Sequence, residues 1–242
     1  MKKLIILALA VLSVCFTGCN YSNKAWIQKR LENMESYSGN PGNAEQIKKD
    51  IEKYDEEAKT LVEKYEKMGI WYKILGTRYL DKKMYGKALE SFQKALEFYP
   101  ENPNLYYYVG LCAGFVSHSA MDFSGRGDDS AKQNYLNLAE NAFKQAIQID
   151  SKYAKALYSL GVLYAFDLDN ASEAVKYLER YVNIEKRDTD GMMVLARAYY
   201  MSYEFDKAVD MYDKVISISK SADRKAEAEA NKKVVLDASY GN

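Results

Sequence analysis

The sequence predicts an all-α fold, a right-handed solenoid in which similar helical pairs follow one another. Only 3 of the 242 residues are proline, which suits helices joined by short turns. Small residues recur at intervals of 34, 51 and 35, at Gly76, Gly110, Gly161 and Ala196. A second track recurs at intervals of 51, 35 and 34, at Ala88, Ala139, Ala174 and Ala208. The tracks agree if 17 residues are inserted before Ala139 and one before Ala174.

The N-terminus has the pattern of an export signal. Lys2 and Lys3 precede an apolar run from Leu4 to Phe16, which is too short to span a bilayer. The sequence Phe16-Thr17-Gly18-Cys19 resembles a bacterial lipobox, although Phe16 stands where leucine is usual. We therefore expect a lipoprotein signal peptide over residues 1–18 and lipidation at Cys19; ordinary cleavage or an uncleaved anchor are the alternatives. The expected location is a bacterial membrane, facing the periplasm.

Residues 19–68 are expected to hold the lipid anchor and an N-terminal helical pair. In the first helix, 23–36, apolar side chains share one face: Trp26, Ile27, Leu31 and Met34. The sequence SGNPGN (38–43) predicts a turn. Ala44–Met68 then has apolar residues spaced about every 3.5 positions. We expect an antiparallel pair that docks on the repeats, with a solvent-exposed stalk as the alternative.

The residues that follow carry a known motif. Tyr72-x2-Leu75-Gly76-x2-Tyr79 is followed at fixed offsets by Ala88, Phe92, Ala95 and Pro100. This resembles the tetratricopeptide repeat (TPR), a helix–turn–helix unit of about 34 residues, with Tyr72 in place of the usual tryptophan. The resemblance and the recurrence predict about four repeats, at 69–102, 103–153, 154–188 and 189–220. Residues 221–242 are expected to form a capping helix and a tail.

The 17 extra residues fall in the second repeat, over 114–130. We expect both helices of that repeat to lengthen, with a loop at 124–130. The lengthened part either forms a binding element or packs on a neighbour. His118 and Asp122 share a helix face, but two ligands make a poor metal site. The tripeptide Arg126-Gly127-Asp128 matches an adhesion motif but carries almost no information.

Composition excludes several function classes. Lys+Arg 34 balances Asp+Glu 34, so nothing favours nucleic acid. No glycine-rich phosphate loop follows a strand, and one histidine leaves no metal cluster. Cys112 lies in an apolar helix and is expected to be a buried, inert thiol. We expect no enzyme activity, no cofactor and no metal.

The resemblance to TPR proteins implies a concave groove lined by the first helix of each repeat. Carried onto this sequence, the groove residues are Lys73, Thr77, Tyr107, Leu111, Phe115, Tyr158, Val162, Phe166, Met193, Arg197 and Tyr200. The set is mostly apolar and aromatic with two cations. It favours an apolar peptide, a partner helix or an amphipathic small-molecule ligand with an acidic group.

Two function classes follow from this resemblance. The first is a membrane-anchored interaction scaffold in the bacterial cell envelope, since similar lipoproteins serve outer-membrane assembly, pilus assembly and envelope complexes. The second is a ligand-handling subunit, since some TPR lipoproteins associate with TRAP-type transporters. A surface adhesin is a weaker third class. An open groove would favour the scaffold, whereas an enclosed cavity would favour ligand handling.

Overall fold

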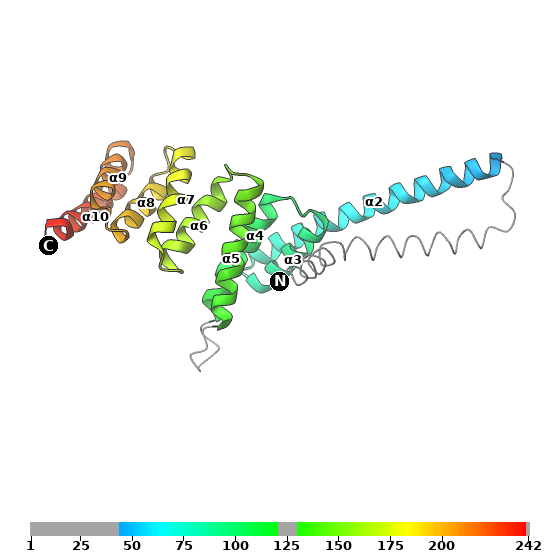
Figure 1. Ribbon diagram of the computed structural model, residues 1–242, viewed down its shortest axis with the longest axis horizontal. Coiled ribbons are helices and arrows are strands. Elements are labelled where there is room, and N and C mark those ends of the chain that lie inside the picture. The colour runs from blue at the N-terminus through cyan, green and yellow to red at the C-terminus, as the bar shows by residue number, and fades with distance from the viewer. Residues whose placement is uncertain (1–43, 121–129, 241–242) are drawn as a thin grey trace, which may run out of the picture. The chain divides into compact units, whose positions relative to one another are not determined.

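A computed structural model of the chain describes residues 44–120 and 130–240. Within these residues every regular element is an α-helix, which confirms the predicted fold class. The helices, labelled in Figure 1, are α2 (Ala44–Asp81), α3 (Tyr85–Phe98), α4 (Pro103–Ala120), α5 (Ser130–Ile149), α6 (Ala154–Phe166), α7 (Ala171–Ile184), α8 (Thr189–Met201), α9 (Phe205–Ile218) and α10 (Ala222–Tyr240).

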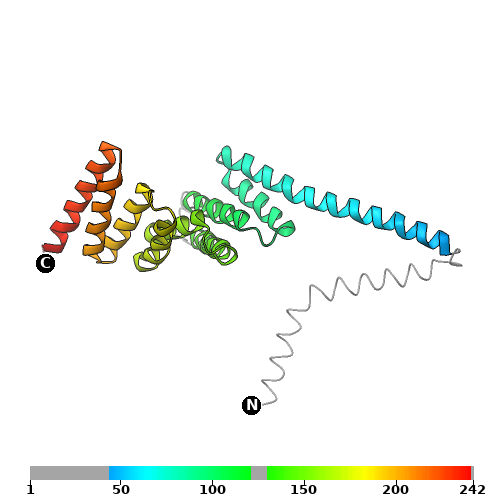
Figure 2. The same ribbon diagram turned by 90° about the horizontal axis from the view of Figure 1, so that it is seen from above.

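The chain divides into two compact units, Met1–Leu61 and Val62–Asn242. In the second unit each helix from α3 to α10 contacts the next one along the chain. Figures 1 and 2 show these helices following one another in order. Helix α4 also contacts α6, and α6 contacts α8, so the first helices of successive pairs are neighbours. Helix α10 packs on α9 as the capping helix.

The described part of the first unit is the N-terminal part of α2. Its residues from 45 to 61 are exposed, including the apolar side chains of Ile47, Ile51 and Leu61. The signal peptide (1–18), Cys19, the helix expected at 23–36 and the turn at 38–43 all lie outside the described residues. The expected helical pair therefore stays a prediction.

Helix α2 corrects one predicted boundary. The expectation that a helix ends at Met68 is wrong, because α2 runs without a break from Ala44 to Asp81. Gly69 does not interrupt the helix; it allows α3 to approach closely, since a Cβ there would lie 2.5 Å from Tyr99 Cε2. The Tyr99 hydroxyl donates a hydrogen bond to the backbone carbonyl of Glu66 at 2.8 Å. The first repeat therefore begins inside a longer helix.

Glycines on the first helix of a pair face large side chains on the second. A Cβ on Gly110 would lie 2.6 Å from Phe143 Cε1, and a Cβ on Gly161 would lie 2.5 Å from Leu178 Cγ. Gly76 faces Phe92 in the same way, at 2.8 Å. The partner alanines of the second track are fully buried: Ala88, Ala139, Ala174 and Ala208. The glycines of the first track therefore meet the large side chains that follow three of these buried alanines by four residues.

Tyrosine hydroxyls join one pair to the next. Tyr164 on α6 donates to Glu140 Oε1 on α5 at 2.6 Å, and Tyr199 on α8 donates to Glu179 Oε1 on α7 at 2.7 Å. Burial raises the pKa of Glu140, but hydrogen bonds from Lys144 and Tyr164 outweigh it and leave the pKa below its usual value. The carboxylate therefore accepts both bonds in its charged form.

The second pair is longer than the two pairs that follow it. Helix α4 has 18 residues and α5 has 20, compared with 13 in α6 and 14 in α7. Of the loop predicted at 124–130, Ser130 already begins α5, and the rest lies outside the described residues together with Asp122 and Arg126-Gly127-Asp128. Helix α4 therefore extends past Gly114 and ends at Ala120.

Two glycines in α4 provide a matched test of this packing. A Cβ on Gly110 would clash with Phe143, whereas a Cβ on Gly114, one turn later, would meet no atom within 4 Å. We expect Gly110→Ala to lower the free energy of unfolding by about 1–3 kcal/mol through overpacking. Gly114→Ala should raise it by about 0.5–1 kcal/mol, because alanine is the better helix former. Urea unfolding followed by circular dichroism measures both, and equal effects would contradict this orientation of α4.

Candidate functional site

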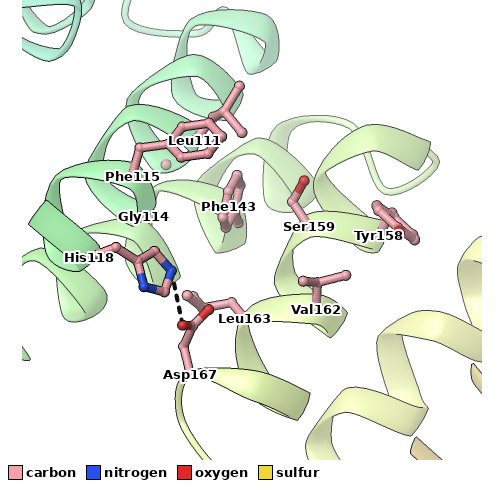
Figure 3. A pocket seen from close by; sticks show the side chains of 11 residues that line it. Leu111, Gly114, Phe115, His118, Phe143, Tyr158, Ser159, Val162, Leu163 and Asp167 are labelled. Atoms are coloured by element: carbon pink, nitrogen blue, oxygen red, sulfur yellow. Dashed lines mark ion pairs between the residues drawn. The ribbon is translucent and has the colours of Figure 1, made fainter. Parts of the chain in front are cut away.

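The described residues form an apolar pocket between α4 and α6, which we call the α4–α6 pocket (Figure 3). Its volume is ≈ 240 Å³, and it is an open hollow rather than an enclosed cavity. Figure 3 shows Leu111 and Phe115 on the α4 side, Val162 and Leu163 on the α6 side, and Phe143 between them. The remaining lining residues are Gly110, Gly114, His118, Tyr158, Ser159 and Asp167.

Glycine shapes the floor of this pocket. The missing side chain of Gly110 leaves the space that the Phe143 ring of α5 occupies. Gly114 leaves a second space, and no side chain fills it. Since Gly110 and Gly114 are one turn apart, they lie on the same face of α4. Gly110 therefore makes room for the Phe143 ring at the floor of the pocket, and Gly114 leaves the hollow open.

The lengthened end of α4 supplies one end of the pocket. His118 Nε2 lies 3.2 Å from Asp167 Oδ1, as the dashed line in Figure 3 shows. The Asp167 carboxylate is mostly covered, whereas the imidazole is exposed. Phe115 stacks on Tyr85 of α3 with ring centroids 4.4 Å apart, yet it remains 41% exposed. Phe115 therefore both packs on a neighbour and presents apolar surface.

A second pocket lies farther along the same row of first helices, and we call it the α6–α8–α10 pocket. Its volume is ≈ 430 Å³, and it too is open. Tyr158 lines both pockets, so we name the two together the α4–α8 groove. The other lining residues are Phe166, Asp190, Met193, Val194, Arg197, Tyr200, Tyr212, Arg224, Glu227, Asn231, Val234 and Val235.

Charged groups in the α6–α8–α10 pocket differ in their partners. Arg224 of α10 forms ion pairs with Asp190 of α8 and with Glu227. Arg197 instead lies over the Phe166 ring, with its guanidinium carbon 4.8 Å from the ring centroid. This arrangement is a cation–π contact between α8 and α6.

Two tyrosine hydroxyls near the groove and the Cys112 thiol are neutral near pH 7. Burial raises the pKa of the Tyr107 and Tyr158 hydroxyls, and the nearby Asp188 and Asp190 raise the pKa of Tyr158 further. Burial also raises the pKa of the Cys112 thiol to about 12, so this thiol is protonated and unreactive. Within the described residues, no three His, Cys, Asp or Glu side chains gather closely enough to hold a metal. His118 pairs with Asp167 rather than belonging to such a cluster.

The predicted groove residues divide into two sets. The pockets bring together Leu111, Phe115, Tyr158, Val162, Phe166, Met193, Arg197 and Tyr200. Lys73, Thr77 and Tyr107 line neither pocket. The Thr77 hydroxyl donates to the Lys73 carbonyl within α2, at 3.0 Å. Tyr107 is half-buried, and its ring centroid lies 5.9 Å from that of Tyr153.

Several lining residues were not predicted. Gly114 could have been found, because it follows Gly110 by four residues and so shares its helix face. Asp167 follows the end of α6, and the sequence carries no signal that it meets His118. Arg224 and Asn231 come from the capping helix, whose side chains the repeat register does not assign to any face.

Comparison with known proteins agrees with this architecture. One family model described as tetratricopeptide repeat matches residues 71–102 and 154–188. A second model with the same description matches residues 190–222. A TPR repeat-containing protein from Borreliella burgdorferi is 28% identical over 233 residues, covering 95% of this chain and 96% of the relative. The chain therefore contains tetratricopeptide repeats, as the motif around Gly76 predicted.

Solved structures show the same fold. A human IFIT1 dimer with m7Gppp-AAAA matches with a TM-score of 0.57 at 20% identity, covering 68% of this chain and 38% of that chain. YrrB, described as a TPR protein with an unusual peptide-binding site, matches with a TM-score of 0.53 at 20% identity, covering 75% of this chain and 88% of that chain. At these identities the likeness concerns the fold alone.

Proposed function

We propose that this protein is a membrane-anchored adaptor of the bacterial cell envelope that binds a segment of a partner protein in the α4–α8 groove. The observation that carries this proposal is the α4–α6 pocket, an open apolar hollow on the row of first helices. Extended concave surfaces of this kind are what stacked helical repeats use for binding. The YrrB structure, with the same fold, is described as having a peptide-binding site.

The size of the pocket favours a side chain over a free small molecule. The ≈ 240 Å³ of the α4–α6 pocket lies below the roughly 300–1,000 Å³ of pockets that enclose drug-sized ligands, whereas the ≈ 430 Å³ of the α6–α8–α10 pocket lies within that range. An open hollow also admits a side chain while the rest of the partner stays outside. The transporter-associated, ligand-handling alternative would be favoured by an enclosed cavity, and both pockets are open. A role in envelope assembly or pilus assembly is a narrower form of the adaptor proposal.

The chemistry of the groove favours binding rather than catalysis. The titratable side chains of the α4–α6 pocket are His118, Asp167 and Tyr158, and the first two are paired with each other. Apart from the Ser159 hydroxyl, aromatic and aliphatic groups form the rest of its side-chain lining. Such surfaces supply binding energy through buried apolar area. We propose that the protein acts without catalytic residues of its own.

The anchor rests on the N-terminal sequence. Lys2 and Lys3, the short apolar run and Cys19 together fit an exported protein that is lipidated after cleavage. None of the described helices has the length and apolar character needed to cross a membrane. On the pattern of residues 1–19, membrane attachment is by the lipid on Cys19, with the groove facing the periplasm.

Site-specific photocrosslinking in cells tests the groove. A photoreactive residue at Phe115, which lines the α4–α6 pocket, should give a discrete adduct with one partner protein. The same residue at Tyr203, 82% exposed in the turn between α8 and α9, should not.

Filling the pocket provides the control for this experiment. Gly114→Leu should reduce the Phe115 adduct at least tenfold, because the new side chain occupies the open space that Gly114 leaves in the α4–α6 pocket. Gly86→Leu is the matched control, since Gly86 also has no atom within 4 Å of an added Cβ but lies on α3 outside the groove. An adduct that Gly114→Leu leaves unchanged would contradict the groove as the binding site.

Replacement of the lipidated residue tests the anchor. Cys19→Ser should abolish metabolic labelling with an alkyne-tagged palmitate and move the protein from the membrane fraction to the soluble fraction. Cys15→Ser, four residues earlier in the expected signal peptide, should leave both unchanged. Continued labelling of Cys19→Ser would show that this cysteine is not the lipid site.

A further inference from the structure

Arg197 is a cation in the groove without an acidic partner. Its guanidinium rests on the Phe166 ring, and among the described residues no carboxylate oxygen lies within 4.0 Å of its nitrogens. The two acids that line the same pocket, Asp190 and Glu227, are both held by Arg224. The two arginines and two acids of the α6–α8–α10 pocket balance in formal charge, but both acids contact Arg224, so the Arg197 guanidinium has no carboxylate in contact with it.

The surroundings of Arg197 suit a negatively charged group. Phe166 holds the guanidinium through a cation–π contact, which uses no hydrogen-bond acceptor. Burial raises the pKa of the neighbouring Tyr212, so its hydroxyl is neutral and adds no negative charge. Arginine pairs with carboxylates through two parallel N–H···O bonds, which gives both affinity and orientation.

The other end of the groove has no such charge. At the α4–α6 pocket His118 and Asp167 are paired, and the hollow between them and Tyr158 is apolar. The groove is therefore polarised along its length, with an apolar pocket at α4–α6 and an unpaired cation at α8.

We propose that the occupant of the groove is a partner segment with a bulky apolar side chain in the α4–α6 pocket and an aspartate or glutamate side chain bound by Arg197. This inference rests on the proposed function and specifies the partner's chemistry. Packed helices lie about 8–10 Å apart, and an extended chain rises about 3.3 Å per residue. The apolar residue and the acid are therefore separated by roughly three to six residues.

A peptide-display selection on the full chain tests this inference. The probe is a random library of 12-residue segments fused at both ends, so that no free C-terminal carboxylate is present. Wild-type protein should enrich sequences with an aromatic or large aliphatic residue and an Asp or Glu at a constant separation. Arg197→Glu should keep the apolar preference and replace the acid by Lys or Arg at the same position.

Two further variants separate the parts of the groove. Gly114→Leu should remove the apolar preference and keep the acidic one, because it fills only the α4–α6 pocket. Arg187→Glu is the charge-matched control, since Arg187 is exposed in the turn between α7 and α8 and lines neither pocket; it should enrich the same sequences as wild type. Circular dichroism melting establishes that each variant is folded.

The outcomes distinguish this inference from the function on which it rests. If wild-type protein enriches no sequence, both the peptide-binding function and the inference are overturned. If it enriches apolar segments without an acid, or if Arg197→Glu leaves the acidic preference unchanged, only the role of Arg197 is overturned. For an enriched peptide, Arg197→Ala should weaken binding at least tenfold by fluorescence anisotropy, and Arg187→Ala should not.

Discussion

The contact between a glycine on the first helix and a large side chain on the second, made in the first three pairs, is the constraint on which this structure depends. In the second pair that contact joins Gly110 to Phe143. A side chain at Gly110 would push the helices apart, and the Phe143 ring would lose the space it occupies. The same ring is the floor of the α4–α6 pocket. One close contact therefore holds the pair together and shapes the proposed binding surface.

The lengthened second pair gives the groove features that the other pairs lack. Its extra turn brings His118 to Asp167 at the end of α6, which closes one end of the pocket. Phe115 packs on Tyr85 and also lines the pocket, so packing and presenting a surface are not alternatives for this side chain. At the other end, the capping helix contributes Arg224, whose ion pairs leave Arg197 as the exposed cation. The repeats are similar, but the ends of the groove differ in chemistry.

Much of the fold could be predicted because helix packing imposes a period on the sequence. The intervals between Gly76, Gly110 and Gly161 reflect one contact repeated in space. The boundary drawn at Met68 does not coincide with a helix end, because α2 continues through Gly69 to Asp81.

The site was harder to predict. The position of a residue within the repeat assigns it to a helix face, but it does not show whether that residue lines a pocket. Lys73 and Thr77 occupy first-helix positions, yet neither pocket extends to them. Asp167 and Arg224 reach the groove through contacts between distant segments, which no local pattern encodes.

Methyl NMR of the full chain measures most directly whether partners bind on the face made by the first helices. A peptide selected on the wild-type chain would be titrated into protein labelled at Leu, Val, Ile and Met methyl groups. We expect the shifts to concentrate on Leu111, Val162 and Met193, which line the groove. Shifts that concentrate instead on second-helix methyls such as those of Leu89, Val175 and Ile216 would contradict this expectation.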